Sequence, residues 1–372
     1  MIDQIAAAFD RQDYRVAAKL LKEFLHDSPQ DPAQNLWGQF YRARLYEVSG
    51  KLESAREIYR HLLRDGSNPK LANQSRQGLQ RLDEQEHADR KQAIAQATAQ
   101  PESTEPGVLI LESMPSETRT AAAQALARVL KLDPYTARMQ IPQRGWRLYR
   151  VGAIGELQLY GQQIRAAKIP AFWASLDALQ KLPVFQVHSI QAYQPGAIVL
   201  CENEQGQLGS LNFDWSEVCQ RVEGRLPIFE RVVDTDIRRG TTERQRRETT
   251  QDYAHLCDLH LPKRRCILRI CDLNYQFQQG IAFSAPAGDS IALDQATNRI
   301  HWNNLLAFLN YQLPQQPVWS EFQAFSETAI DQPLLFKRFK SHVRLFGQDT
   351  SPWNPTFHLY SGLAFLKSFA DA

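Results

Sequence analysis

The chain has 372 residues, with 43% hydrophobic and 23% charged residues and a formal net charge of +2. This length predicts two or three domains, and the ordinary apolar fraction is enough to give each of them a core. The near balance of charge excludes a protein whose whole surface is strongly basic and binds nucleic acid, so any basic patch must be local.

Nothing in the sequence predicts a membrane-spanning or a secreted protein. No apolar run approaches the length of a membrane span, and the first residues, MIDQIAAAFDRQDY, lack a basic flank followed by an apolar core. The five cysteines are an odd number, which is not the pattern of a disulfide framework. We therefore expect no signal peptide, reduced thiols and a cytoplasmic protein.

Residues 37–63, WGQFYRARLYEVSGKLESAREIYRHLL, carry the most specific pattern of the chain. The small side chains of Ala43 and Ala55 allow two helices to approach closely, Gly50 permits a tight turn between them, and Tyr59 fills the remaining space. The segment therefore predicts a helical hairpin. It resembles the tetratricopeptide repeat (TPR) family, whose consensus has a small residue, an aromatic, a glycine, an alanine and another aromatic in this order.

A second, earlier copy of the hairpin aligns with the first and pairs Ala17 with Ala55. It departs from the family pattern because Gln12 stands where the glycine is expected, and the spacing of the copies exceeds the usual period of about 34 residues. Two copies need a cap, which we expect from the helix-rich segment 69–99. The resemblance implies a TPR-like module over residues 1–97, and the alternative is an ordinary helical hairpin.

The TPR resemblance also implies a binding surface. In that family the partner lies along the concave face, which is lined by the first helix of each hairpin. The residues that this places in the groove are Gln39, Arg42 and Tyr46 in the second copy, with Asp3 and Phe9 in the first. The function implied is that of an adaptor that binds a protein partner.

Residues 98–107 contain two prolines, a glycine and small polar residues, and predict a linker. The following segment, 108–178, has the order strand, two helices, strand and helix, with Ser116 as the expected N-cap of the first helix. This order predicts a small α/β domain of ferredoxin-like character. It resembles the C-terminal domain of the ribosomal stalk protein, without any residue that would carry a function across.

Residues 179–372 are expected to form an α+β domain with an antiparallel sheet. Alternating apolar and polar residues with turn signals predict strands from Leu182 onward, and helices are expected at 299–313 and 333–346. The C-terminal aromatic residues are expected on an irregular segment that leads into a last helix. These residues are Trp353, Phe357 and Tyr360.

One group of side chains has the chemistry of a metal site. It consists of Cys257, His260, Cys266 and Cys271. The group lacks the Cys-x-x-Cys pair of structural zinc sites, and the odd spacing of Cys266 and Cys271 on a strand places them on opposite faces. We therefore expect buried cysteines, no metal and no cofactor.

Two basic clusters support an alternative function, binding of nucleic acid or another polyanion. They are Arg238, Arg239, Arg244, Arg246 and Arg247, followed by Lys263, Arg264 and Arg265. Guanidinium groups bind phosphate through paired hydrogen bonds. The acidic residues interspersed in the first cluster are equally typical of a solvated face. Polyanion binding would weaken steeply with salt, whereas binding in an apolar groove would weaken less.

No catalytic motif is present. The sequence has no glycine-rich phosphate loop, no Gly-x-Ser-x-Gly and no His-Glu-x-x-His. Asp234 and Asp236 follow a predicted strand, where such pairs are common at turns. His301, His342 and His358 each stand alone on apolar segments. An enzyme of unrecognised type in the C-terminal half is the third hypothesis, and no feature of the sequence identifies or excludes a small-molecule ligand.

Overall fold

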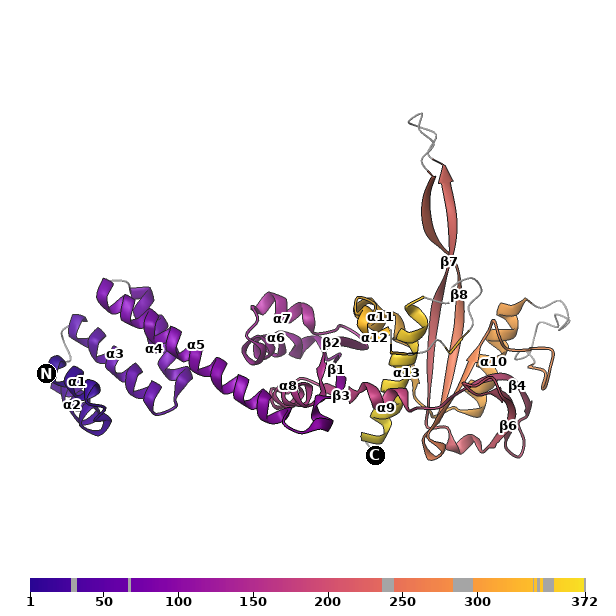
Figure 1. Cartoon of the computed structure of the whole chain (residues 1–372), viewed down its shortest axis with the longest axis horizontal. Coiled ribbons are helices and arrows are strands. Elements are labelled where there is room, and N and C mark those ends of the chain that lie inside the picture. The colour runs from indigo at the N-terminus through magenta and orange to yellow at the C-terminus, as the bar shows by residue number, and fades with distance from the viewer. Residues whose placement is uncertain are drawn as a thin grey trace. The chain divides into compact units, whose positions relative to one another are not determined.

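In the computed structural model of the chain, the secondary structure is described for residues 1–27, 32–65, 68–235, 244–283, 297–336, 338–339, 342–343 and 351–370. The chain divides into two compact units, an N-terminal unit (Met1–Gln96) and a C-terminal unit (Ala97–Ala372). The described part of the first unit is helical, and the second contains sheets and helices (Figure 1). The expected order, helices first and then a part that contains sheets, is confirmed.

The N-terminal unit consists of helices that follow one another in antiparallel hairpins. They are α1 (Ile2–Asp10), α2 (Tyr14–Asp27), α3 (Pro32–Val48), α4 (Leu52–Asp65) and α5 (Pro69–Ala97). Gly50 ends the α3–α4 turn with φ +75°, in the left-handed region that glycine adopts without strain. Gln12, at the aligned position between α1 and α2, has φ +58°. Both turns therefore require the same left-handed backbone, although only one of them has the glycine.

The core of this unit is built from the small and aromatic residues of the pattern. Ala17, Ala43 and Ala55 are fully buried, and so is Tyr59. A Cβ atom on Gly78 would lie 2.6 Å from Cζ of Tyr59, so α5 approaches α4 as closely as a glycine allows. The small residues thus set the distances between helices, as expected from the sequence.

The C-terminal unit begins with the strands of a small sheet and the helices next to them. They are η1 (Pro101–Thr104), β1 (Pro106–Glu112), α6 (Ser116–Leu130), α7 (Pro134–Gln140), β2 (Trp146–Ala153), α8 (Ile154–Ala166), β3 (Ala171–Ser175) and α9 (Leu176–Gln180). The three strands lie in the order β2-β1-β3 and are antiparallel. Three details differ from the expectation: β3 was not predicted, Pro106 and Gly107 belong to β1, and Ser116 is the first helical residue after its N-cap, Pro115.

A second, larger sheet follows. Its elements are β4 (Val184–Ala192), β5 (Ala197–Glu202), β6 (Leu208–Phe213), η2 (Trp215–Glu217), β7 (Gln220–Thr235), β8 (Arg244–Leu261), η4 (Pro262–Arg264), β9 (Cys266–Cys271), α10 (Asn298–Gln312), β10 (Val318–Trp319), α11 (Phe322–Ala329), α12 (Pro333–Phe336) and α13 (Trp353–Ala370). The strand order is β10-β7-β8-β9-β4-β5-β6. The sheet is mixed, because β4 and β9, and likewise β10 and β7, are neighbours that run parallel.

The β7–β8 hairpin extends beyond the rest of the large sheet (Figure 1). On one side β10 pairs only with Arg221 and Val222, and on the other side β9 pairs only with residues 256–261. Within the described residues, the remainder of the two strands therefore has only strand partners in the hairpin itself.

One hydrophobic core joins the two sheets. It contains Val108 and Ile110 of the small sheet, Leu256 of the large sheet, and Phe357 of α13. Lys367 of α13 forms an ion pair with Glu112 of β1. The sheets expected as separate domains, 108–178 and 179–372, therefore share a core within one compact unit.

The C-terminal aromatic residues lie on a regular helix instead of the irregular segment expected. Trp353, Phe357 and Tyr360 belong to α13, and the last two are almost completely buried. Because the helix is buried on most of its faces, its sequence lacks the amphipathic period that identifies a surface helix. In the sequence Pro355 also argues against a helix at this position, although a proline in the first helical turn interrupts no intrahelical hydrogen bond.

Candidate partner-binding site

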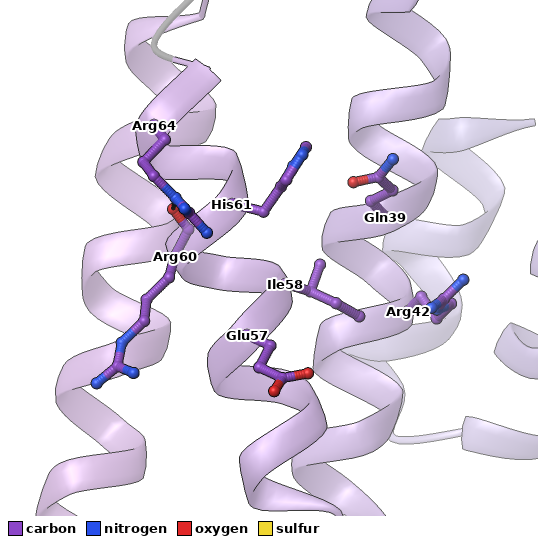
Figure 2. A pocket seen from close by; sticks show the side chains of 7 residues that line it. All are labelled: Gln39, Arg42, Glu57, Ile58, Arg60, His61 and Arg64. Atoms are coloured by element: carbon purple, nitrogen blue, oxygen red, sulfur yellow. Dashed lines mark hydrogen bonds between the residues drawn. The ribbon is translucent and has the colours of Figure 1, made fainter. Parts of the chain in front are cut away.

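The α3–α4 hairpin has a surface pocket of about 570 Å³, which we call the α3–α4 groove (Figure 2). The side chains that line it are Gln39, Arg42, Glu57, Ile58, Arg60, His61 and Arg64. Gln39 and Arg42 were expected in a groove from the sequence, and they lie together on α3. Tyr46, the third expected residue, is not among the lining residues.

The spacing of the residues explains why they gather on one surface. Gln39 and Arg42 are three positions apart on α3, and Glu57, His61 and Arg64 follow at intervals of four and three on α4, so each set shares a helix face. The opposite face of α4 is directed into the core. That face includes Ala55, Tyr59 and Leu62, all buried. The groove therefore occupies the solvent-exposed side of the hairpin.

The charge of the groove is predominantly positive. Arg42, Arg60 and Arg64 contribute three guanidinium groups, His61 adds a positive charge when protonated, and Glu57 is the one acidic side chain in the lining. All three arginines are exposed. The groove can therefore attract carboxylate or other anionic groups, and Ile58 and the aliphatic parts of the arginines supply an apolar floor.

Tyr46 supports the groove instead of lining it. The guanidinium carbon of Arg42 lies 5.6 Å from the centre of the Tyr46 ring, and Nζ of Lys51 lies 5.7 Å from the same centre. Such cation–π contacts restrict the cation to the ring. Tyr46 thus helps to hold Arg42 at one end of the groove.

The expectation for the first hairpin is wrong for Phe9. Its side chain is 3% exposed and stacks on Tyr41 at a centroid distance of 5.4 Å, and the Arg44 guanidinium lies 4.7 Å above it. A large aromatic residue buried at the contact of α1 with α3 stabilises the core, so the Phe9 side chain does not face a partner. Asp3 is exposed on α1 but does not line the α3–α4 groove.

Ion pairs hold α5 against the hairpin. Arg56 of α4 pairs with Asp83 at 3.0 Å and with Glu86 at 2.9 Å. Arg81 of α5 pairs with Glu47 of α3 at 2.7 Å. The hydroxyl of Tyr59 donates to Glu47, and burial, together with this carboxylate, raises the pKa of Tyr59, so the donor stays protonated. These contacts fix the α3–α4 pair that presents the groove.

Sequence reasoning missed the α4 half of the groove, which consists of Glu57 and Ile58 as well as Arg60, His61 and Arg64. The family resemblance directed attention to the first helix of each hairpin only. The available signal was the helical spacing of these residues on the face opposite to Tyr59 and Leu62.

Within the described residues, the two basic clusters considered for polyanion binding lie at opposite ends of β8. Arg244, Arg246 and Arg247 lie at the start of β8, and Arg238 and Arg239 lie outside the described residues. The 18 residues of β8 span roughly 55 Å at the rise of a strand, and the second cluster follows its far end.

Only part of the second basic cluster is free to bind an anion. Arg264 forms paired hydrogen bonds with Glu217 at 2.8 and 2.7 Å, and this contact is the main cause that lowers the pKa of Glu217 to about 2. Lys263 and Arg265 are exposed. The cluster therefore has fewer uncompensated charges than its sequence suggests.

The cysteine and histidine residues are dispersed. Cys266 belongs to the core on the α10 side of the large sheet, and Cys271 belongs to the core shared with the small sheet, so they lie on opposite faces as expected. Cys257 is buried on the same side as Cys266. Burial raises the pKa of Cys266 to about 11 and that of Cys271 to about 12. Among the described residues, no group of three or more His, Cys, Asp or Glu could hold a metal ion.

His260 is part of a buried hydrogen-bond network. Its Nδ1 lies 2.9 Å from Gln220 Nε2 and its Nε2 lies 3.0 Å from Ser361 Oγ. The Ser361 hydroxyl donates to Asp258, which also accepts two hydrogen bonds from Arg269. Burial lowers the pKa of His260 to about 4, so the ring is neutral. Asp258 binds Ser361 and does not orient the histidine, and all of these side chains are buried, so the network has a structural role and not the geometry of a catalytic triad.

Comparison with protein-family models, with curated proteins and with solved structures gave no match to this chain. None of the described helices has the length and apolar character that crossing a membrane requires.

Proposed function

We propose that the chain is an adaptor whose N-terminal TPR-like module binds an acidic segment of a protein partner in the α3–α4 groove. The observation that carries this proposal is that three arginines, Arg42, Arg60 and Arg64, line one pocket in which Glu57 is the single acidic lining residue. The equivalent left-handed turns at Gln12 and Gly50 support the assignment of two repeat copies. Five free cysteines accord with a cytoplasmic location.

The groove favours a peptide segment over a compact ligand. Its lining residues extend along about two turns of α4, from the negative Glu57 at one end to the positive Arg64 at the other. A segment with carboxylates spaced along its length can meet Arg42 and Arg64 together, and Ile58 offers contact to an apolar side chain between them. The likeness of residues 108–175 to the ribosomal stalk domain adds no binding residue to this proposal.

The experiment is capture of partners from native extract by the immobilised full chain, beside the double variant Arg42→Glu/Arg64→Glu. We expect the variant to lose the partner, because each substitution places a carboxylate opposite the acidic segment. The matched control is Arg15→Glu/Arg76→Glu, which reverses two exposed arginines of α2 and α5 outside the groove. Equal capture by both double variants would show that the groove is not the site.

The alternative, polyanion binding through the basic clusters, is tested in the same experiment. Each eluate is analysed for protein and for nucleic acid at low and at high salt. Contacts to phosphates release counterions, so nucleic acid would be removed by salt and would be retained by the groove variant. That outcome would transfer the function to Arg244–Arg247 or Lys263–Arg265.

A further inference from the structure

The C-terminal unit has a second groove, of about 490 Å³, which we call the α13 groove. It lies where the end of α13 meets the end of α9 and the turn between β8 and β9. The residues that line it are Ala178, Lys181, Leu182, Pro183, Arg264, Arg265, Phe365, Leu366 and Phe369. Two of them, Arg264 and Arg265, were singled out in the sequence for their charge alone.

The floor of the α13 groove is apolar. Phe365 and Phe369 are one helical turn apart on α13, and their rings lie 5.3 Å from centre to centre. Phe365 is buried, whereas Phe369 remains 47% exposed. Leu366 and Leu182 continue the apolar surface. An aromatic side chain left half in water gains free energy when a partner covers it.

The rim of the α13 groove is basic. Lys181, Arg264 and Arg265 are its charged residues, and no acidic side chain lines it. Arg264 is held by Glu217, which fixes its position and compensates its charge. Arg265 has φ +52° in the turn that follows η4 and is exposed, and Lys181 directly follows α9. Among the described residues, neither Lys181 nor Arg265 has an ion-pair partner.

We propose that the α13 groove is a second docking site, which binds a short segment of a protein that carries bulky apolar side chains flanked by Asp or Glu. The rim charges select acidic residues, and the floor accepts the apolar side chains between them. A segment that crosses the groove can cover the half-exposed ring of Phe369 and reach the cations of the rim at the same time. This proposal goes beyond the function proposed for the N-terminal unit and does not depend on it.

The test is selection from a display library of random 15-residue peptides on the full chain, followed by synthesis of the enriched peptides and measurement of Kd by fluorescence anisotropy. We expect peptides with two or more bulky apolar residues next to Asp or Glu. In the double variant Lys181→Glu/Arg265→Glu, Kd should rise at least about tenfold, which corresponds to ~1.4 kcal/mol. Phe369→Ser should weaken the same peptides and leave those that bind the α3–α4 groove unchanged.

The matched control is Lys91→Glu/Arg138→Glu, which reverses two exposed cations outside the groove and should change Kd less than about twofold. Thermal unfolding of each variant establishes that it is folded. The proposal is overturned if the enriched peptides lack the acidic and apolar pattern, or if Lys181→Glu/Arg265→Glu leaves their Kd unchanged. It is also overturned if no peptide is enriched and the full chain instead binds phosphatidylserine vesicles through these cations. Arg42 and Arg64 are intact in all of these variants. A negative result for the α13 groove therefore does not contradict the function proposed for the α3–α4 groove.

Discussion

At the scale of single residues, two turns of the N-terminal unit have the same left-handed backbone conformation. Gln12 and Gly50 both have positive φ and each lies between the helices of a hairpin. Side chains at these angles bring Cβ close to the backbone, at a cost of roughly 1–2 kcal/mol that glycine avoids. The departure from the repeat pattern at Gln12 is therefore a change of side chain and not of conformation.

We expect Gln12→Gly to stabilise the N-terminal unit by about 0.5–1 kcal/mol, because the strain removed exceeds the extra entropy that glycine has in the unfolded chain. The measurement is denaturant unfolding of the full chain, followed at a probe within residues 1–96. Gly50→Gln is the reciprocal variant and should destabilise by a similar amount. A decrease in stability for Gln12→Gly would show that the Gln12 side chain contributes more than its backbone strain costs.

At the scale of elements, a buried polar network fixes how α13 lies on the large sheet. Gln220 of β7, His260 of β8 and Ser361 of α13 are connected by hydrogen bonds, and Trp319 of β10 donates to Gln220. Every member would be costly to leave unpaired in the core. The network therefore specifies one register for the helix, in addition to the apolar contacts that surround it.

This network predicts a pH dependence of stability. The pKa of His260 falls from 6.5 to about 4 on folding, mainly through burial. Between these values the unfolded chain binds a proton that the folded chain does not. The contribution of His260 to the free energy of unfolding is therefore fully present above pH 6.5 and is lost as the pH falls toward 4, by up to about 3 kcal/mol. Thermal unfolding of wild type and His260→Gln from pH 4 to 7.5 should show a smaller pH slope in the variant. Parallel slopes would contradict this assignment to His260.

At the scale of the whole molecule, the two sheets of the C-terminal unit share one core, so we expect them to unfold together. Lys367 illustrates this, because its ammonium pairs with Glu112 and lies 5.6, 5.3 and 5.6 Å from the ring centres of Trp146, Phe172 and Trp319. These rings come from the small sheet and from β10 of the large one. Lys367 of α13 thereby contacts both β1, the first strand of the unit, and β10, the last.

We expect Lys367→Met to destabilise the C-terminal unit by about 1–2 kcal/mol, because it leaves the partly buried Glu112 carboxylate without its partner. Glu112→Gln should cost a similar amount, and the double variant should cost less than the sum of the two. The measurement is a double-mutant cycle of thermal unfolding. Additive effects would show that the ion pair itself contributes no coupling between β1 and α13.

The local properties of this protein were readable from its sequence. The helices of the N-terminal unit, the turn at Gly50 and the opposite faces of Cys266 and Cys271 follow from periods of 3.6 and 2 residues and from backbone preferences, which act over a few neighbouring positions. Gln39 and Arg42 were assigned to a groove in advance because the resemblance to the TPR family implies a binding surface there.

Tertiary structure alone decided which distant segments meet. The shared core of the two sheets, the parallel pairs of the large sheet and the burial of α13 depend on long-range packing that no local pattern records. Phe9 of α1 is part of the core because Tyr41 of α3 stacks on its ring. The α13 groove exists because residues 178–183, 264–265 and 365–369 fold against one another, and side chains that distant in sequence acquire a common function only when the chain has packed.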